Sequence, residues 1–176
     1  MPLNTGKDLE IQRAVQLLKQ GELVVIPTET VYGLAADAKN PAAINKIFAL
    51  KGRPANHPLI VHIAGAEQLA QWAVDIPVVA YRLAEQFWPG PLTLVLPRST
   101  SAREMELGGA SGTVGVRCPD SDFVRMLAAH VGPIATTSAN RHGEPTATDA
   151  AAAASSLVGL VDLVVDGGPA GTVAST

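Results

Sequence analysis

The sequence contains a single cysteine, Cys118, among its 176 residues. An internal disulfide and a zinc site built from several cysteines are therefore excluded. Aromatic residues make up only 4% of the chain, and no apolar run approaches the roughly 20 residues that a membrane helix needs. The N-terminus also lacks the apolar segment of a signal peptide. These absences predict a soluble, cytoplasmic protein that does not contact a membrane.

Charge of one sign is not in excess either. Thirteen Lys and Arg residues stand against 16 Asp and Glu residues, which gives a formal net charge of −3. This balance argues against nonspecific coating of nucleic acid by the whole surface, although it is compatible with a local basic cleft. Hydrophobic residues make up 47% of the chain, enough for a packed core. Because no internal repeat, linker or charge block divides the chain, we expect residues 1–176 to form one domain.

The apolar pattern predicts helices and strands in alternation. Helices are expected at residues 8–20, 40–51, 67–73, 78–87, 121–131 and 149–156, and strands at residues 23–26, 59–63, 92–96, 113–117, 134–137 and 160–165. Such alternation is typical of an α/β fold. We therefore predict a single-domain, twisted open sheet of mixed or parallel strands with flanking helices.

The standard phosphate-binding loops are missing from the sequence. There is no Walker A motif, and no GxGxxG follows the first expected strand. The most glycine-rich stretch, residues 108–115, is typical of a turn before a strand, although its hydroxyls and backbone N–H groups also suit an anion-binding nest. A nucleotide would therefore have to be bound by other segments.

Two loops offer polar groups that suit such a site. Residues 27–34 directly follow the first expected strand and carry two hydroxyls, a carboxylate and a phenol; loops at this place bind ligands in open α/β sheets, although a plain polar turn is the alternative. Lys51 and Arg53 lie just past a helix, in a loop interrupted by Gly and Pro. Two cations placed there suit a phosphate or a carboxylate. The alternative is a helix-terminal charge beside a solvated arginine.

Three other segments are weaker signals. His62 lies within an apolar strand, where a hydrogen-bonded core histidine is more common than a ligand. Trp88 stands beside two prolines and is predicted to support a turn. Residues 136–140 place hydroxyls and an amide at the end of a strand, which suits a small polar substrate and a phosphate, or equally an N-cap or Asx turn. Together the segments predict a site that binds anions and positions reactants, without a Ser–His–Asp arrangement or a metal quartet.

Seven motifs in a fixed order make the chain similar to a known family. They are PTETVYGL, KGRP, PLIVHI, WPGPLT, VGVRCP, TSAN and DGG, and the similarity extends from about residue 8 to the C-terminus. In this order they resemble the YrdC-like threonylcarbamoyl-AMP synthases. The family signature pairs K-x-R with S-x-N, which here are Lys51 and Arg53 with Ser138 and Asn140. The resemblance implies a twisted α/β sheet with a concave, basic cavity.

The resemblance also implies a reaction and its residues. L-threonine, bicarbonate and ATP would give threonylcarbamoyl-AMP and pyrophosphate, for the modification of adenosine at tRNA position 37. ATP would be a substrate, with Mg²⁺ held mainly by its phosphates and no metal site in the protein. The residues implied for threonine are Thr30, His62, Arg117 and Thr137; those implied for ATP are Arg53, His57, Thr113, Ser138 and Asn140, with Lys51 and Arg53 as the catalytic cations. The implied partners are tRNA or double-stranded RNA and the proteins of the threonylcarbamoyl-transfer machinery.

The chain departs from the family pattern at two places. Position 57 is His, where the family often has Asn or Lys, and the chain ends at Thr176, where family members usually continue into one more strand that carries an arginine for ATP. We therefore expect a single domain that lacks this last strand.

Three alternatives to the synthase remain from the sequence. One is a noncatalytic module that binds double-stranded RNA or tRNA, which the acidic net charge and the few aromatics disfavour. Its candidate contacts are Arg82, Arg98, Arg103, Arg125 and Arg141. The second is a carbamoyl-adenylate-forming domain like that of hydrogenase maturation proteins, whose acylphosphatase and zinc-finger segments are missing here. The third is a YrdC-like paralogue without the synthase activity.

Overall fold

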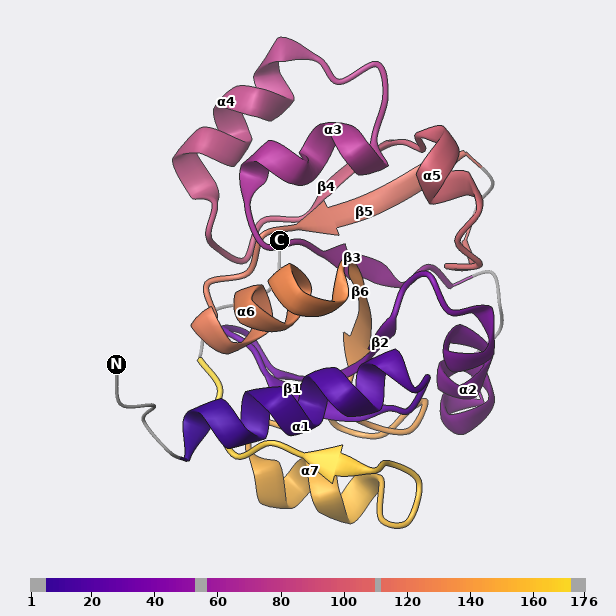
Figure 1. Cartoon of the computed structure of the whole chain (residues 1–176), viewed down its shortest axis with the longest axis vertical. Helices are drawn as coiled ribbons and strands as arrows, with labels where there is room; N and C mark the ends of the chain where they lie inside the picture. Colours follow the sequence, from indigo (N-terminus) through magenta and orange to yellow (C-terminus); the bar gives the residue numbers. More distant parts are fainter. Residues whose placement is uncertain (1–5, 53–56, 110–111, 172–176) are drawn as a thin grey trace.

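A mixed seven-stranded sheet organises the structure, a computed structural model that describes residues 6–52, 57–109 and 112–171 (Figure 1). The strands are β1 (Val24–Pro27), β2 (Tyr32–Asp37), β3 (Ile60–His62), β4 (Leu94–Pro97), β5 (Thr113–Arg117), β6 (Ile134–Ser138) and β7 (Leu163–Val164). Their order across the sheet is β4-β5-β3-β6-β2-β1-β7. The pairs β3–β5 and β1–β7 are parallel, and the other neighbours are antiparallel. This arrangement confirms the predicted α/β fold with a mixed open sheet.

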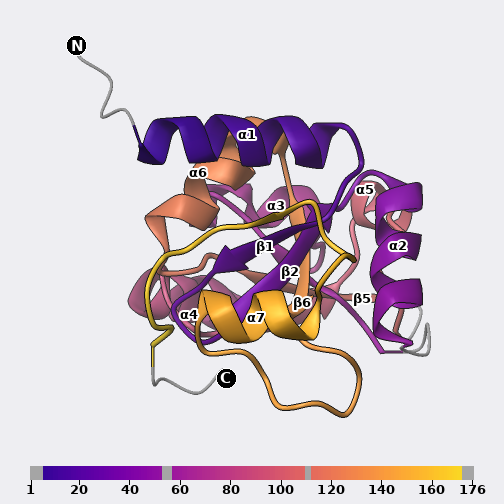
Figure 2. The ribbon, with the colours of Figure 1, turned by 90° about the horizontal axis from the view of Figure 1, so that it is seen from below.

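Helices pack on both faces of this sheet. They are α1 (Lys7–Lys19), α2 (Pro41–Lys51), the short 3-10 helix η1 (Ala66–Gln68), α3 (Leu69–Trp72), α4 (Val78–Phe87), α5 (Thr100–Arg103), α6 (Asp122–Val131) and α7 (Ala150–Ser156). Seen from below, β1 and β2 lie between α1 and α6 on one side and α7 on the other (Figure 2). Within the described ranges, none of these helices has the length and apolarity needed to cross a membrane.

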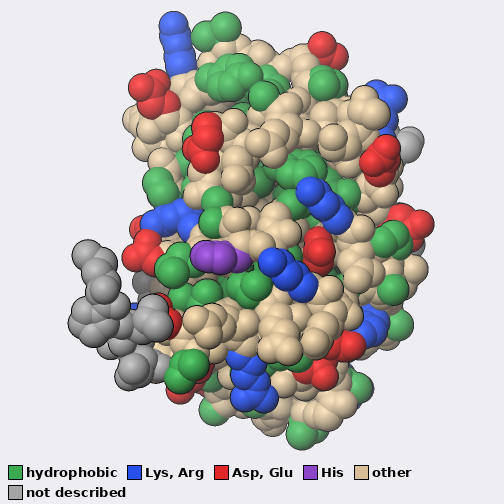
Figure 3. Space-filling view, viewed as in Figure 1, with side chains coloured by type: hydrophobic (Ala, Val, Ile, Leu, Met, Phe, Trp, Pro, Cys, Tyr) green, Lys and Arg blue, Asp and Glu red, His purple; other side chains and the backbone are tan. Residues whose placement is uncertain are grey.

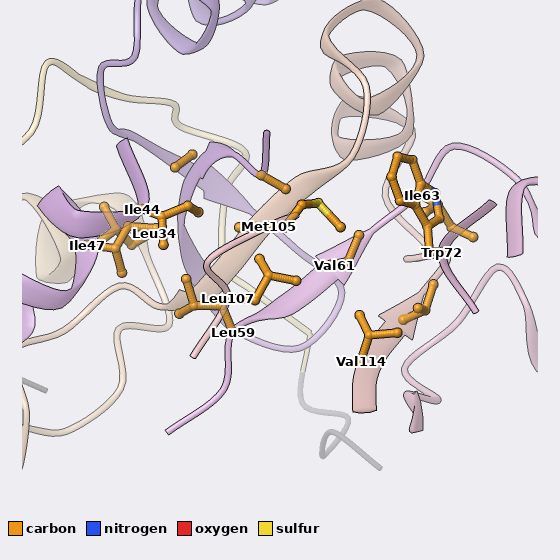
Figure 4. Close-up of a cluster of buried hydrophobic side chains, with 14 of the residues drawn as sticks. Leu34, Ile44, Ile47, Leu59, Val61, Ile63, Trp72, Met105, Leu107 and Val114 are labelled. Carbon is orange, nitrogen blue, oxygen red and sulfur yellow. The ribbon is translucent and has the colours of Figure 1, made fainter. Parts of the chain in front are cut away.

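The alternation of side chains along the strands divides the core in two. Val24, Ile26, Ala35 and Ile134 belong to a smaller cluster that packs under α1 and α6. Their strand neighbours point the other way, into a larger cluster that Figure 4 shows in part. The residues labelled there are Leu34, Ile44, Ile47, Leu59, Val61, Ile63, Trp72, Met105, Leu107 and Val114. Side chains two residues apart on a strand face the same side of the sheet. Thr136 and Ser138 therefore face the α1 and α6 side, as Ile134 does.

The prediction that residues 27–34 form one loop is wrong for their second half. Only residues 28–31 connect the strands, and β2 begins at Tyr32. Five of the six β2 residues are buried, so the strand lacks the polar–apolar alternation that reveals a half-exposed strand. Gly33, Ala35 and Ala36 also have low β-propensity. The short helix α5 was not predicted either.

The segment 166–171, which contains the DGG motif, crosses over the loop after β1. The hydroxyl of Tyr32 donates to the carbonyl of Gly168 at 2.6 Å and accepts from the backbone N–H of Gly167 at 3.1 Å. A Cβ atom at Gly171 would lie 2.1 Å from the carbonyl oxygen of Glu29. Since no side chain fits at this approach, glycine is required where the two segments cross.

Candidate functional site

The predicted threonine residues meet at one cavity of about 180 Å³, here called the inner cavity. It is lined by Thr28, Thr30, Val31, Gly33, Ile60, His62, Arg117, Thr136, Thr137 and Ser138. Strands β2, β3, β5 and β6 and the loop before β2 supply these residues. The register places His62 beside Arg117, and Ile60 beside Thr136. Thus Thr30, His62, Arg117 and Thr137 are brought together, as the sequence implied.

Arg117 supplies the positive charge of the inner cavity. Its side chain is 3% exposed, and its Nε and Nη2 donate to the hydroxyl of Thr93 at 3.0 and 2.8 Å. Its Nη1 donates to Oε1 of Glu29 at 3.4 Å. Burial lowers the pKa of Arg117 and the carboxylate of Glu29 opposes that shift, but the guanidinium remains charged. Thr93 and Glu29 therefore fix a buried cation in the wall of the cavity.

His62 is buried and neutral. Burial and, after it, the positive charge of Arg117 lower its pKa to about 3. Its Nε2 lies 3.3 Å from the hydroxyl of Thr136, and its Nδ1 has no hydrogen-bond partner in the described part of the chain. A neutral imidazole supplies one donor and one acceptor rather than a second cation. His62 is therefore suited to hydrogen bonding with a small polar ligand.

Two threonines shape the loop that enters the cavity. The hydroxyl of Thr28 donates to the carbonyl of Val31 at 2.6 Å and accepts from the backbone N–H groups of Thr30 and Val31 at 3.2 and 3.3 Å. The two threonine hydroxyls lie 3.1 Å apart. Thr28 therefore acts as an ST-turn that presents Thr30 to the cavity.

Three of the four signature residues, Lys51, Ser138 and Asn140, also meet, although Lys51 does not lie in an irregular loop. It is the last residue of α2 and is 5% exposed. Its ammonium donates to the carbonyls of Ser138 and Asn140 at 2.6 and 2.8 Å. The side-chain amide of Asn140 donates to the carbonyl of Glu144 at 2.8 Å. Hydrogen bonds from Lys51 and from the side-chain amide of Asn140 therefore stabilise residues 138–140, here called the signature turn.

Two further residues predicted for ATP, His57 and Thr113, lie near the signature turn and on the sheet. The rings of His57 and His142 meet edge to face, with centroids 6.1 Å apart, so His57 lies near the turn. Thr113 is exposed and lines a separate groove of about 370 Å³, the outer groove. Its other lining residues are Pro58, Leu59, Ile60, Thr93, Val95 and Gly115. The inner cavity and the outer groove share Ile60. Arg53 lies outside the described residues.

Two side chains that contact Arg117 were not assigned from the sequence. Glu29 was only one polar group of its loop, and its pairing with Arg117 depends on the sheet register. Thr93 ends the WPGPLT motif, which was predicted to be structural. That prediction is confirmed for Trp88, which is 8% exposed and whose indole donates to the carbonyl of Leu92 at 2.7 Å. The only sequence signal for Thr93 was its place at the start of a strand.

The described polar groups of the site are mostly cations, hydroxyls and amides. Among the described residues, no group of three or more His, Cys, Asp or Glu side chains could hold a metal ion. Beside the signature turn the described carboxylate is that of Glu144, which accepts from the hydroxyl of Ser156 at 2.6 Å.

The fold and the site define an α/β protein with a cavity at a mixed sheet, and the lining of this cavity suits small polar and anionic ligands. A family model named for Sua5, YciO and YrdC, with the description "Telomere recombination", matches residues 16–176. The chain belongs to this family.

Relatives of known name support the assignment. The threonylcarbamoyl-AMP synthases of Bacillus subtilis and Pyrococcus abyssi are 45% and 44% identical to this chain, over 93% and 92% of its length. The chain spans about half the length of these relatives, 48% of each. The crystal structure of P. abyssi Sua5 complexed with L-threonine matches with a TM-score of 0.88 and 44% identity, over 93% of this chain and 48% of that one.

Proposed function

We propose that this chain makes threonylcarbamoyl-AMP and pyrophosphate from L-threonine, bicarbonate and ATP. The observation that carries the proposal is the inner cavity, where Thr30, His62 and Arg117 converge in a fold shared with a relative that binds L-threonine. The product would serve the threonylcarbamoyl modification of adenosine at tRNA position 37.

Threonine would occupy the inner cavity. A buried guanidinium suits the substrate carboxylate, because arginine pairs with carboxylates through two parallel hydrogen bonds. The hydroxyl of Thr30 and the neutral ring of His62 would pair with the substrate hydroxyl and amine, and Thr137 would line the cavity beside them. A cavity of about 180 Å³ has the size for one small amino acid and not for a nucleotide.

ATP would lie across the signature turn and the outer groove. Lys51, Arg53, His57, Ser138 and Asn140 would surround its phosphates, and Thr113 would lie along the outer groove. Since Lys51 donates to backbone carbonyls of the turn, it would act by fixing Ser138 and Asn140 and by its nearby charge. Mg²⁺ would be carried by the phosphate oxygens.

The chemistry needs positioning more than a protein nucleophile. The amine of threonine and bicarbonate form a carbamate with loss of water, and an oxygen of that carbamate attacks the α-phosphate as pyrophosphate leaves. Reactions of this type depend on in-line alignment and on neutralisation of phosphate charge. Cations at the signature turn would neutralise the phosphate charge, and the cavity that holds the amino acid would align the carbamate with the α-phosphate. Burial would also shield the carbamate from water.

Pyrophosphate release tests the proposal. The protein is incubated with ATP, bicarbonate and either threonine or valine, which has the shape of threonine without its hydroxyl. We expect release with threonine to exceed release with valine by at least about tenfold, because unpaired hydroxyl partners disfavour valine. Removal of dissolved CO₂ should abolish the product. Equal rates with both amino acids would refute the threonine assignment, and adenylate formation without CO₂ would indicate simple aminoacyl adenylation.

The alternative RNA-binding module receives less support. On the face shown in Figure 3, Lys and Arg side chains are interspersed with Asp and Glu. Arg98 donates to the carbonyls of Thr113 and Gly108 at 2.6 and 2.8 Å, and Arg125 is paired with Asp122. If the protein is an RNA-binding module, its affinity for a tRNA stem-loop should decrease steeply as the salt concentration rises.

Contacts with tRNA and with proteins of the transfer machinery remain part of the proposed function.

A further inference from the structure

We infer that Glu29 accepts the α-ammonium of the amino-acid substrate and so makes the site selective for amino acids over carboxylic acids of the same shape. This inference rests on the proposed function, because it assigns a further residue to the threonine end of that site. In this site Glu29 would supply the negative charge for the substrate ammonium, and Arg117 the positive charge for the substrate carboxylate.

The first observation is the position of the Glu29 carboxylate. Its side chain is 11% exposed, and its Oε1 lies 3.4 Å from Nη1 of Arg117, which lines the inner cavity. The residues on either side of Glu29, Thr28 and Thr30, also line that cavity. Glu29 itself lines a neighbouring cavity of about 420 Å³, between α1, the start of α6 and residues 166–171. Glu29 therefore lies next to the inner cavity, and its carboxylate contacts the guanidinium that lines that cavity.

The second observation is that Oε2 of Glu29 is buried and has no hydrogen-bond partner within the described ranges. Three buried side-chain atoms of these ranges lack a partner, and two of them, Oε2 of Glu29 and Nδ1 of His62, belong to the surroundings of Arg117. A buried carboxylate oxygen without a donor is unfavourable, and native proteins rarely leave one. A ligand that donates a hydrogen bond would satisfy Oε2 of Glu29, whereas Nδ1 of His62 would need a donor or an acceptor according to its tautomer.

An amino acid has the charges that this pair requires. It carries a carboxylate and an ammonium on one carbon atom, so its two charges lie as close together as those of Arg117 and Glu29. An ammonium donates charge-assisted hydrogen bonds to a carboxylate, and these are stronger than neutral ones. A ligand without the ammonium would leave Oε2 unpaired, and sites with unpaired buried polar atoms reject such analogues strongly.

Ligand binding to the wild-type protein tests the inference directly. Equilibrium binding is measured for L-threonine and for its α-hydroxy analogue, which keeps the carboxylate and the β-hydroxyl and replaces the ammonium by a hydroxyl. We expect threonine to bind at least about tenfold more tightly. Equal affinities would overturn the inference without the need for any variant.

The variant Glu29→Gln removes the charge and keeps the shape. We expect it to bind threonine about tenfold more weakly, to lose most of the preference over the α-hydroxy analogue, and to bind ATP as the wild type does. Glu29→Asp keeps the charge and should keep the preference. Glu10→Gln is the matched control, because Glu10 lines the same neighbouring cavity but is not bonded to Arg117, and it should behave as the wild type. A Glu29→Gln protein that melts at a lower temperature but keeps the wild-type preference would show a merely structural role.

Failure of the inference and failure of the proposed function give different results. If the wild type releases pyrophosphate with threonine and Glu29→Gln keeps the preference for the ammonium, only the inference is wrong. If the wild type does not use threonine, the proposed function is wrong, and alanine against lactate then tests Glu29 as an ammonium acceptor by itself. Equal binding of that pair would overturn the inference as well.

Discussion

Acid is expected to destabilise the protein through His62. Burial, and after it the charge of Arg117, lowers the pKa of this residue to about 3 from an ordinary value of 6.5. Between these values the unfolded chain binds a proton that the folded protein does not bind, so the free energy of unfolding decreases as the pH falls. The stability that depends on neutral His62 is complete above the ordinary pKa and is progressively lost toward the folded-state pKa.

The size of the effect follows from the two pKa values. At about pH 5 the unfolded imidazole is almost fully protonated and the folded one is almost fully neutral. The solution is then about 1.5 pH units below the ordinary pKa, and since one pKa unit corresponds to about 1.4 kcal/mol, the loss is roughly 2 kcal/mol. For a domain of this size, such a loss is a substantial part of the total stability.

Urea denaturation at about pH 8 and about pH 5 measures this loss. Other groups also titrate between the two conditions, so the wild type is compared with His62→Gln, which keeps a polar group near Thr136 and does not titrate. We expect the wild type to lose roughly 2 kcal/mol more than the variant between the two conditions. His130→Gln removes an exposed imidazole and should respond as the wild type does. Equal losses in the wild type and His62→Gln would refute the buried, neutral assignment.

Three other substitutions test the contacts around the site. Lys51→Met removes the lysine donor from the carbonyls of Ser138 and Asn140, of which Ser138 keeps the backbone N–H of Asn140, and should cost about 1–3 kcal/mol in urea denaturation. Lys46→Met, whose pair with Glu22 is partly exposed, should cost less than about 1 kcal/mol. Tyr32→Phe removes both hydrogen bonds to residues 166–171 and should speed amide hydrogen exchange in that segment. An unchanged exchange rate would show that these hydrogen bonds do not hold the segment in place. Thr93→Val removes an acceptor of Arg117 and should raise the KM for threonine several-fold. Because Thr93 also lines the outer groove, the KM for ATP should rise less, and an unchanged KM for threonine would contradict the role of the Arg117 contact.

The sequence predicted the elements of the fold better than the contacts of the site. Helix α2 was recognisable because Asn40 and Pro41 form an N-cap and first-turn pair, and the side chain of Asn40 does accept from the backbone N–H groups of Ala42 and Ala43. Strand β2 was missed because a central strand buried on both faces, with Gly and Ala among its residues, lacks the usual alternation. Local patterns therefore failed where burial rather than periodicity determines the structure.

The candidate site was predicted as a set of segments but not as a set of contacts. Lys51 and Ser138 were paired through the family resemblance, and the structure joins their side chains across 87 positions of the sequence. The pair of Glu29 and Arg117 spans 88 positions and carries no local signal, since it depends on which strands are neighbours. The predicted end of the helix at about Lys51 is confirmed, since Gly52 is a left-handed C-cap; the expectation that Lys51 belongs to the irregular loop beyond the helix is wrong.

The charge of the site differs between the inner cavity and the signature turn, and this difference suits the two substrates of the proposed function. At the inner cavity the cation Arg117 is matched by the carboxylate of Glu29, and His62 is neutral, so the described groups there sum to about zero. At the signature turn Lys51 adds a positive charge. A zwitterion is best accommodated where opposite charges are paired, and a triphosphate where positive charge is in excess. Under the proposed function, ATP would therefore be disfavoured in the inner cavity by charge as well as by volume, and the amine would be held where its carbamate can reach the α-phosphate.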